Sequence, residues 1–523
     1  IYIDLQICSK AENVDLDFLF HKQGEKHKIG DYSKTGIKLD YSQWYFYFDE
    51  IETHEAETAA KDFYRSIAGI KKQLIEYIRD SIKDSYFEGH VYIVGGTVRD
   101  SILGNDIHDI DLAIDLAYGD VGFANFMTFK DGSLKQDSNP VVLPKCETYK
   151  FKLLNNKDFS DIEIECTQTI KTKEKLNDKS KSFGTVEQDA EMRDFTINSI
   201  YYNISTDELK DFTNKGFSDI SNKILRTCNK PDVTFDNDPI RIIRVLRLAS
   251  TLGFKIEKET WLSMLKNSNK VLNLSSDSII NETKKILVSE KPSVAIKYML
   301  RCNELISYIL PSLQIQQRIK LYNNLDVTLL DNTLDILDTI EPKLEYRLSA
   351  LLCNLGKVKT YKNNFNNNAE EGAVLSKKWL ETMGFPIGIT NKVSLAIKLH
   401  ESFIAYKGKN LPSKSSLREF KANAGENYDL ALALIDAINK NSLYKKNSNQ
   451  VNIIRNKITA LEKKDNKNLS VVKLPINGSD IINKFSLKTS PLIGTLLKTV
   501  KKEYFNNPNI TKEECFEIIS KLI

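Results

Sequence analysis

The pattern of apolar and polar residues changes near residue 214. Before that point, short apolar or alternating runs predict strands at residues 91–95, 109–114, 149–154, 162–166 and 197–204. Residues 57–83 repeat apolar positions at helical spacing and predict an amphipathic helix before the first of these strands. Beyond residue 214 the spacing is helical nearly to the end. The predicted fold is α+β: an N-terminal mixed β-sheet head followed by an elongated all-α arm.

A chain of 523 residues exceeds what one hydrophobic core usually covers, so several domains are expected. Residues 1–55 read as short strands and turns around the aromatic cluster "WYFYF", and polar Asn- and Lys-rich stretches interrupt the helical half as surface loops. We expect an N-terminal extension and leading helix (1–85), a mixed-sheet head (86–213), a helical neck (214–300), a helical body (301–435) and a helical tail (436–523).

Composition narrows the class of protein only slightly. A formal net charge of +4 permits an anionic partner without requiring one. The seven cysteines are scattered without a CxxC pair, which argues against a zinc knuckle or a disulfide framework and favours a reducing compartment. No apolar run reaches the roughly 18 residues of a membrane span. We expect a cytoplasmic protein. The first residue is Ile1 rather than Met, which leaves a removed leader open, and with it a mitochondrial, plastid or nuclear pool.

The stretch "YIVGGTVRDSILGNDIHDIDLAI" carries the first candidate chemistry. Asp109 and Asp111 are two residues apart on a predicted strand, so both side chains point to one face with Cα atoms roughly 7 Å apart. A solvated edge strand explains such a pair. The sharper interpretation is a pair of hard oxygen ligands for two Mg²⁺ ions, as in nucleotidyl transfer.

The glycine turn before this strand favours the second interpretation. Gly95 and Gly96 follow a predicted strand, where backbone can approach a phosphate closely, and Arg99 falls in the first turn of a predicted helix. The guanidinium and the free N–H groups of that turn could hold a triphosphate. A GG turn with a nearby arginine is common, but GGxxRD followed by DxD is far more specific.

A second acidic strand follows in "SDIEIECTQ". Its carboxylates share one face and its apolar residues the other, which fits a half-exposed strand as well as a catalytic one. As a catalytic element it would lend a third carboxylate to the metal pair. We choose Glu165 for this role, with Glu163 as the fallback.

The stretch "DNDPIRIIRVLRLASTLGF" predicts a helix with Asp238 as its cap and Pro239 at its first position. Arg241, Arg244 and Arg247 recur every three residues as one basic stripe, which we assign to nucleotide binding, although a solvated basic face would also explain it. Asp238 and Arg241 lie side by side on the first turn.

The Asp238–Arg241 pair suits two of the four bases. Cytosine and adenine each present an acceptor beside an amino donor, which one Arg–Asp pair can satisfy. Guanine and uracil present the reverse order and leave groups unsatisfied at roughly 1 to 3 kcal/mol each. The expected specificity is C and A, with G and U excluded.

Together these motifs resemble the class II tRNA nucleotidyltransferases, the CCA-adding enzymes, which share a polymerase β-type head with bacterial poly(A) polymerases. The matching stretches also include "FGTVEQDAEMRDFTINSIYYNI" and "INETKKILV", and a weaker tail match is "LPINGSDI" with "PLIGTLLKTV". The strong resemblance covers roughly residues 88–300. It implies addition of C and A from CTP and ATP to the tRNA 3′ end, with two Mg²⁺ ions.

The resemblance also implies roles for further residues. Arg193, Asp194 and Asn198 would line the sugar and triphosphate side of the nucleotide. Residues 171–185 are similar to the family's flexible loop, although a plain surface loop is equally consistent. The helical arm would grip the tRNA acceptor stem and elbow, with Lys498, Lys501 and Lys502 as participants. No membrane partner is expected, and the sequence makes no prediction of oligomeric state.

The sequence departs from the family pattern at three places. Met192 replaces the first of two arginines before "DFTIN", Asn237 replaces an acidic residue before Asp238, and Ile170 or Lys171 replaces an arginine after the second acidic strand. Other activities therefore stay open. They are a poly(A) polymerase, an enzyme that adds only CC or only A, and, from a different class, a non-catalytic RNA-binding protein on a degenerate head.

Overall fold

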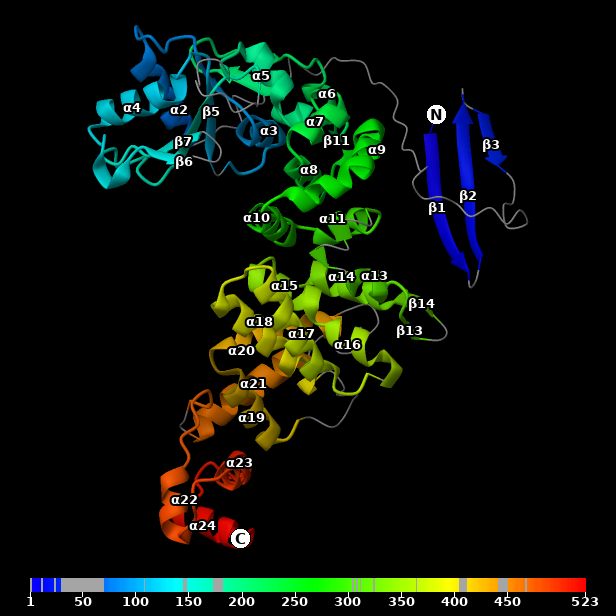
Figure 1. The fold of residues 1–523 in the computed structure, drawn as a ribbon, viewed down its shortest axis with the longest axis vertical. Coiled ribbons are helices and arrows are strands. Elements are labelled where there is room, and N and C mark those ends of the chain that lie inside the picture. Colours follow the sequence, from blue (N-terminus) through cyan, green and yellow to red (C-terminus); the bar gives the residue numbers. More distant parts are fainter. Residues whose placement is uncertain are drawn as a thin grey trace. The chain divides into compact units, whose positions relative to one another are not determined.

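The structure is a computed structural model (Figure 1). It describes residues 2–10, 13–22, 25–29, 70–107, 109–143, 148–172, 182–302, 305–306, 309–310, 312–322, 325–363, 365–403, 412–440, 450–465 and 468–523. Two compact units divide the chain. Unit 1 consists of Ile1–Glu282 with Lys297–Leu305, and unit 2 consists of Thr283–Ile296 with Ile306–Ile523. The finer division into neck, body and tail stays a prediction.

A seven-stranded mixed sheet forms the centre of unit 1. The sequence predicts a mixed sheet here, but only five of its strands. Its spatial order is β10-β9-β4-β5-β8-β7-β6. β5 and β8 pair in parallel, and the other neighbours are antiparallel. The strands are β4 (Val91–Ile93), β5 (Ile110–Ile114), β6 (Val141–Leu143), β7 (Thr148–Phe151), β8 (Ile164–Gln168), β9 (Ile200–Asn203) and β10 (Leu209–Asp211).

Helices surround this sheet and bury its apolar face. α4 (Gly119–Asp131) contacts β7 and β8, and Phe123 of α4 packs edge-on against Phe87 and Phe151 with ring centroids 5.4 and 6.1 Å apart. The other helices before the unit boundary are α2 (Ile70–Ile82), α3 (Gly96–Leu103), α5 (Val186–Met192), α6 (Gly216–Ser221), α7 (Pro231–Asn237), α8 (Ile240–Leu252) and α9 (Lys258–Asn267). A short parallel pair, β11 (Ile224–Leu225) and β12 (Lys255–Ile256), lies among them.

Several predicted strands differ in their bounds; β8, for example, begins at Ile164, two residues later than predicted. Two further differences concern the type or the start of an element. The first part of the strand predicted at 197–204 is a 3-10 turn, η5 (Thr196–Asn198), because the hydroxyl of Thr196 is hydrogen-bonded to Asp219 in α6 at 2.7 Å. The helix predicted from Asp238 starts one residue later, with Pro239 at the N-cap, and α7 precedes it directly. Asp238 is extended (φ −154°) because the residue before a proline disfavours helical backbone.

The N-terminal strands are present where the chain is described. β1 (Tyr2–Lys10), β2 (Asn13–Lys22) and β3 (Glu25–Ile29) form an antiparallel sheet, as the alternation in residues 1–55 predicts. The predicted "WYFYF" cluster, the first half of the helix predicted at 57–83 and most of the loop at 171–185 lie outside the described residues.

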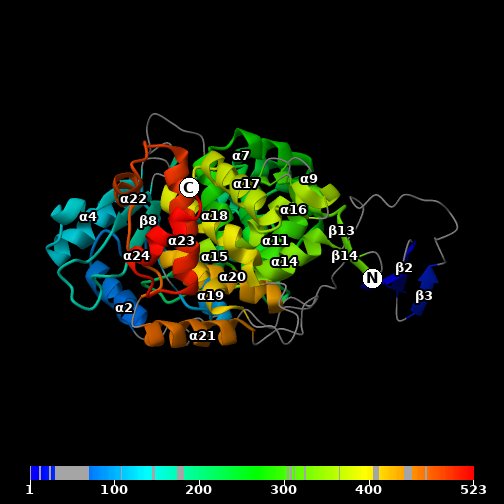
Figure 2. The same cartoon turned by 90° about the horizontal axis from the view of Figure 1, so that it is seen from below.

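Unit 2 is helical almost throughout its described part (Figure 2). α17 (Asn368–Thr382) and α18 (Ile387–Leu399) lie side by side, and α16 (Leu355–Thr360) packs so closely that a Cβ at Gly356 would sit 1.8 Å from the Asn368 carbonyl oxygen. α10 (Ser276–Leu287) and α11 (Pro292–Met299) cross the unit boundary. The remaining elements are α13 (Ser312–Gln316), β13 (Lys320–Tyr322), β14 (Leu325–Thr328), α14 (Leu329–Thr339), α15 (Leu344–Leu352), α19 (Lys414–Ala424), α20 (Tyr428–Lys440), α21 (Gln450–Asp465), α22 (Gly478–Phe485), α23 (Pro491–Asn506) and α24 (Lys512–Ser520).

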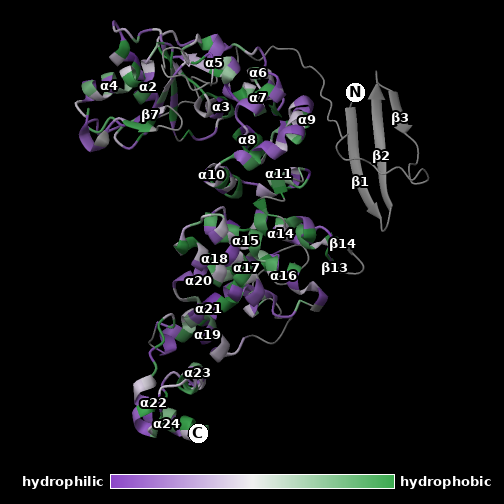
Figure 3. Cartoon of the chain, in the orientation of Figure 1, coloured by the Kyte–Doolittle hydropathy of each residue, from purple (hydrophilic) through white to green (hydrophobic). Residues whose placement is uncertain are grey.

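The helices of unit 2 carry both hydrophobic and hydrophilic residues along their length, as amphipathic helices do (Figure 3). Five cysteines of the described chain are free thiols, four of them buried, which fits the expected role as small apolar residues. Within the described residues, no helix has both the length and the apolar character that crossing a bilayer requires.

His400 is a buried histidine at the end of α18. It is 1% exposed, and its Nδ1 contacts the carbonyl oxygen of Ile397. Burial, and next the charge of Lys357, lower the pKa of His400 to about 4. The folded state therefore resists protonation that the unfolded chain accepts near pH 6.5. The contribution of His400 to the free energy of unfolding is fully present above that pH. It is lost as the pH drops toward 4, and the loss is on the order of 3 kcal/mol.

We expect His400→Gln to remove most of this acid sensitivity, because glutamine does not titrate. Hydrogen exchange of the α18 and α20 amides at pH 7 and pH 5, corrected for intrinsic rates, measures the effect. His90→Gln, in the other unit, is the control and should keep the wild-type slope in α18 and α20. An unchanged slope in the His400 variant would contradict the assignment.

Candidate active site

The glycine turn brings backbone against the acidic strand. Gly95 is the N-cap of α3 and has φ +71°, a conformation that favours glycine. A Cβ there would lie 3.1 Å from Oδ2 of Asp111 and 3.8 Å from Nη1 of Arg193. Any side chain at this position would press on the carboxylate. The first N–H groups of α3, which have no intrahelical acceptor, therefore begin beside Asp111.

Thr97 joins the start of α3 to the acidic pair. Its hydroxyl donates to the carbonyl oxygen of Asp109 at 3.1 Å and accepts from the N–H of Asp111 at 3.2 Å. β5 begins at Ile110, so Asp109 lies in a bend just before the strand and is exposed, whereas Asp111 is half-buried. The two carboxylates thus differ in burial while Thr97 fixes their backbone spacing.

Burial and neighbouring carboxylates disfavour the ionised form of Asp111. Burial, followed by the charge of Glu165, and to a lesser degree that of Asp109, raise the pKa of Asp111 to about 6 against the opposing charge of Arg193. Glu165 is directly opposite Asp111 in the parallel pairing of β5 and β8. A bound cation would relieve this repulsion.

A lysine on the neighbouring strand pairs with the second acidic strand. Lys150 of β7 donates to Oε1 of Glu163 at 2.6 Å and forms an ion pair with Glu165. The other face of β8 is apolar, with Ile164 and Cys166 fully buried. The predicted two-faced strand is confirmed, and both of its candidate carboxylates contact Lys150.

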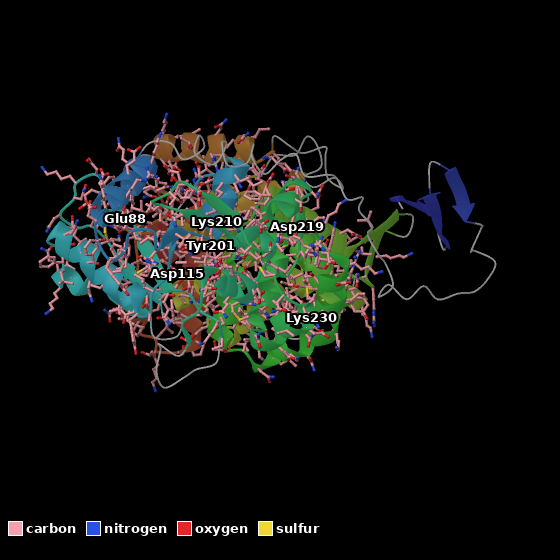
Figure 4. All side chains as sticks on the ribbon, turned by 90° about the horizontal axis from the view of Figure 1, so that it is seen from above. Glu88, Asp115, Tyr201, Lys210, Asp219 and Lys230 are labelled. Carbon is pink, nitrogen blue, oxygen red and sulfur yellow. The ribbon has the colours of Figure 1, made fainter. Side chains whose placement is uncertain are left out.

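Arg193 lies near the same glycine turn, and its charge acts on Asp111. Its Nε donates to Asp189 at 3.2 Å and to the Tyr201 hydroxyl at 2.7 Å, and its guanidinium lies 5.0 Å from the Tyr201 ring centroid. Tyr201, labelled in Figure 4, is fully buried and donates to Asp189 at 2.6 Å. These contacts hold a guanidinium close to Gly95 and Asp111.

A chain of buried hydrogen bonds connects three elements next to this arginine. Arg99 donates to Oδ1 of Asn198 at 2.6 Å and forms a bidentate pair with Asp100. Asn198 in turn donates to Asp194 at 3.0 Å, and Arg244 donates to the other oxygen of Asp194 at 3.0 Å. Burial alone would raise the pKa of Asp194, but Arg244 and Arg241 hold it well below its usual range. Asp194 is therefore ionised at neutral pH.

The predicted arginine stripe on α8 is paired rather than solvated. Arg241 is 3% exposed, donates to the carbonyl oxygens of Met192 and Arg193, and has its Nε 3.7 Å from Oδ2 of Asp238. The predicted Asp238–Arg241 neighbourhood is thus present. Arg247 pairs with Glu282 at 2.7 Å, a contact that holds the helix in place.

The residues present fit a divalent cation that also binds a nucleotide. Among the described side chains, no group of three or more His, Cys, Asp and Glu could enclose a metal ion. Mg²⁺, however, is commonly held by one or two carboxylates together with substrate phosphates. Asp109 and Asp111 supply two such carboxylates, and α3 supplies N–H groups for the phosphates.

Comparisons with known proteins match the head of the chain and part of the helical region that follows. Residues 91–226 match the family described as "Poly A polymerase head domain", and residues 253–316 match "Probable RNA and SrmB- binding site of polymerase A". The mitochondrial CCA tRNA nucleotidyltransferase of Candida glabrata is 34% identical over 230 residues, which are 40% of this chain. The head of this chain is therefore similar to the heads of poly(A) polymerases and CCA tRNA nucleotidyltransferases.

The length that is matched differs between relatives. The chain covers 41% of the Candida glabrata relative. A CCA-adding enzyme of Staphylococcus epidermidis is 24% identical over 432 residues, 82% of this chain and 92% of that protein. The Bacillus stearothermophilus CCA-adding enzyme in complex with CTP has a similar fold, with a TM-score of 0.59 at 16% identity over 87% of this chain and 98% of that one.

The departures from the class II tRNA nucleotidyltransferase pattern fall at different places in the structure. The Met192 contact to Arg241 uses the backbone carbonyl and is independent of the side chain. Asn237 is the last residue of α7 and is exposed. The N–H of Ile170 donates to Asp189 at 3.0 Å, so this departure contributes backbone to the support of Arg193.

Sequence reasoning missed four residues of this candidate site: Thr97, Lys150, Asp189 and Tyr201. Thr97 stands inside "GGTVRD", where a hydroxyl between a glycine turn and an arginine could have been noticed. The other three gave no local signal, because each acts across the sheet or across the turn after α5. No local pattern marks such long-range partners.

Proposed function

We propose that this protein adds C and A nucleotides to the 3′ end of tRNA, using CTP and ATP, by two-metal nucleotidyl transfer. The observation that supports the proposal is the close approach of the Gly95 turn to both Asp111 and Arg193. It aligns the phosphate-binding end of α3 with a carboxylate pair. The CTP complex of the Bacillus stearothermophilus enzyme supports one of the two substrates.

In the proposed reaction, the tRNA 3′-hydroxyl attacks the α-phosphorus of CTP or ATP, and pyrophosphate leaves. Mg²⁺ ions at Asp109 and Asp111 would favour ionisation of that hydroxyl and offset the charge on pyrophosphate. Thr97 keeps the two aspartates at fixed spacing. Arg193 binds the triphosphate, and its contacts to Tyr201 and Asp189 keep it oriented before the substrate arrives.

Base selection falls to Asp238 and Arg241. Arg241 is already oriented by two backbone carbonyls, which leaves the half-buried Asp238 beside it to accept the amino group of cytosine or adenine. Asp194 and Asn198 line the sugar and triphosphate side, and Arg244 keeps Asp194 ionised. Glu165, the third carboxylate expected from the sequence, is paired with Lys150 and adds negative charge beside Asp111 instead of a third metal ligand.

The tRNA would contact unit 2 by shape and phosphate pairing. Lys498 and Lys502 of α23 are exposed, and the Lys501 ammonium lies 5.7 Å from the Phe505 ring centroid. The name of the Candida glabrata relative supports a mitochondrial pool beside the cytoplasmic one.

Sequencing the products made on a tRNA that lacks its 3′ end tests the proposal. With both nucleotides present we expect CCA, with CTP alone only C, and with ATP alone no addition to the bare end. A homopolymer of A would reject the proposal in favour of a poly(A) polymerase. Addition that stops at CC with both nucleotides present, or adds A only to a CC end, would identify a split activity.

We expect Asp238→Ala to lower kcat/KM for CTP and ATP by roughly 10- to 100-fold and to narrow the preference over UTP, because one acceptor for the amino group is lost. Single-turnover incorporation of each nucleotide measures both effects. Asp236→Ala is the matched control: this exposed residue is in the same segment and pairs with Lys270 at the surface. An unchanged preference in the Asp238 variant would reject base reading by this pair.

A further inference from the structure

Three side chains form a charged row across the head sheet. Asp111 on β5 is the register partner of Glu165 on β8, and Glu165 is also the register partner of Lys150 on β7. Register partners on neighbouring strands point to the same face. The charges along the row are therefore negative, negative and positive. Its first residue, Asp111, belongs to the proposed metal site.

Lys150 forms ion pairs with two glutamates of the second acidic strand. Its Nζ contacts both Glu163 and Glu165, and its side chain is only 25% exposed. The two glutamates are two residues apart on one face, so one ammonium serves both. Among the described groups around Asp111, the positive charges of Arg193 and Lys150 act on Asp111, and Lys150 is in addition paired with Glu165.

We propose that Lys150 is a built-in counter-ion that holds Glu165 toward β7 and so restricts the metal seat to Asp109 and Asp111. Lys150 is then a positioning residue: it sets the affinity of the aspartate pair for a divalent cation without touching the substrate. This inference rests on the metal site of the proposed function.

The physical basis is competition between two cations for one carboxylate. The affinity of an oxygen site for a hard divalent cation rises with the number of charged ligands. While Glu165 is bound to an ammonium, it contributes little to such a site. Removing the ammonium leaves Glu165 uncompensated beside Asp111, where it can serve as a further ligand. The free protein should then bind divalent cation more tightly.

Mn²⁺ titration of the full chain without nucleotide, followed by the electron paramagnetic resonance signal of free Mn²⁺, tests this inference. We expect Lys150→Met to bind Mn²⁺ about tenfold more tightly than wild type. Lys150→Arg keeps the positive charge and should stay within about twofold of wild type. The double variant K150M/E165Q should lose most of the gain, because the freed carboxylate is gone.

Unchanged or weaker Mn²⁺ binding by a folded Lys150→Met protein would overturn the inference, as would an equal gain in the K150M/E165Q protein. Folding is checked by circular dichroism and the thermal midpoint. If Lys150 had a purely structural role, Lys150→Met and K150M/E165Q would both have a lower thermal midpoint, and neither would bind Mn²⁺ more tightly.

A further variant separates this failure from failure of the proposed function. D109A/D111A should abolish the tight Mn²⁺ site. If it does and Lys150→Met has no effect, only the role of Lys150 is lost. If D109A/D111A binds Mn²⁺ like wild type, the metal seat lies elsewhere, and both the metal assignment of the proposed function and this inference are rejected.

Discussion

Replacement of Asp111 by Asn should lower nucleotide incorporation by about 10³-fold, equivalent to about 4 kcal/mol of transition-state stabilisation. The amide is neutral and a poor ligand for a hard cation, so it removes the charge that would hold Mg²⁺ against the triphosphate. It also removes repulsion from Glu165, so the folded protein should not be less stable. Single-turnover incorporation on a tRNA without its 3′ end measures the loss.

The same variant separates a nucleotidyltransferase from a non-catalytic RNA-binding protein. Its tRNA affinity should stay within about twofold of wild type, because the phosphate contacts that we propose for tRNA lie in unit 2. Asp106→Asn, an exposed aspartate in the loop before β5, is the matched control and should retain full activity. Incorporation above about a tenth of wild type in the Asp111 variant would reject the metal assignment.

Arg418→Ala should destabilise unit 2 by about 3–5 kcal/mol, because it breaks a buried ion pair and leaves one charge uncompensated. Arg418 of α19 forms a bidentate pair with Asp465, the last residue of α21, at 2.8 and 3.2 Å, and both side chains are less than 10% exposed. Its Nη1 also donates to the carbonyl oxygen of Phe505 near the end of α23 at 3.0 Å. One guanidinium thus joins three helix segments. Denaturant unfolding of the full chain measures the loss.

Limited proteolysis locates the effect. We expect faster cleavage between α21 and α22 in the Arg418 variant, with release of the C-terminal helices and weaker tRNA binding. Arg455→Ala is the control, since its partner Asp429 is 3.8 Å away and both side chains are more than half exposed. Surface pairs of this kind contribute about 0–1 kcal/mol. Equal losses in the two variants would contradict the role given to Arg418.

The spacing of apolar residues along the sequence predicted those strands and helices in which buried and exposed residues alternate regularly. β8 alternates buried Ile164 and Cys166 with glutamates, and that alternation is visible in the sequence. It could not separate the turn at Thr196–Asn198 from the strand that follows, because the turn depends on Asp219, which is 23 residues away. The break between α7 and α8 had a local signal in Pro239, which forces Asp238 out of helical backbone.

The sequence predicted those parts of the candidate site whose residues are close together in a short motif. Spacing in the sequence predicted that Asp109 lies near Asp111 and that Asp238 lies near Arg241. Both pairs are present in the structure. The spacing gave no hint that Arg244 binds Asp194, 50 residues away, or that Lys150 binds Glu163. Such pairs depend on strand register and helix packing, which are properties of the folded chain.

The charged row across β5, β8 and β7 has a consequence for how the sheet assembles. If β8 paired with β5 one residue out of step, Ile164 or Cys166 would face Asp111, and the glutamates would turn into the layer under α4, where Cys166 now contacts the Asp120 carbonyl oxygen at 3.3 Å. Carboxylates trapped there would cost several kcal/mol each. The acidic residues of the candidate site therefore also disfavour misaligned strand pairing during folding.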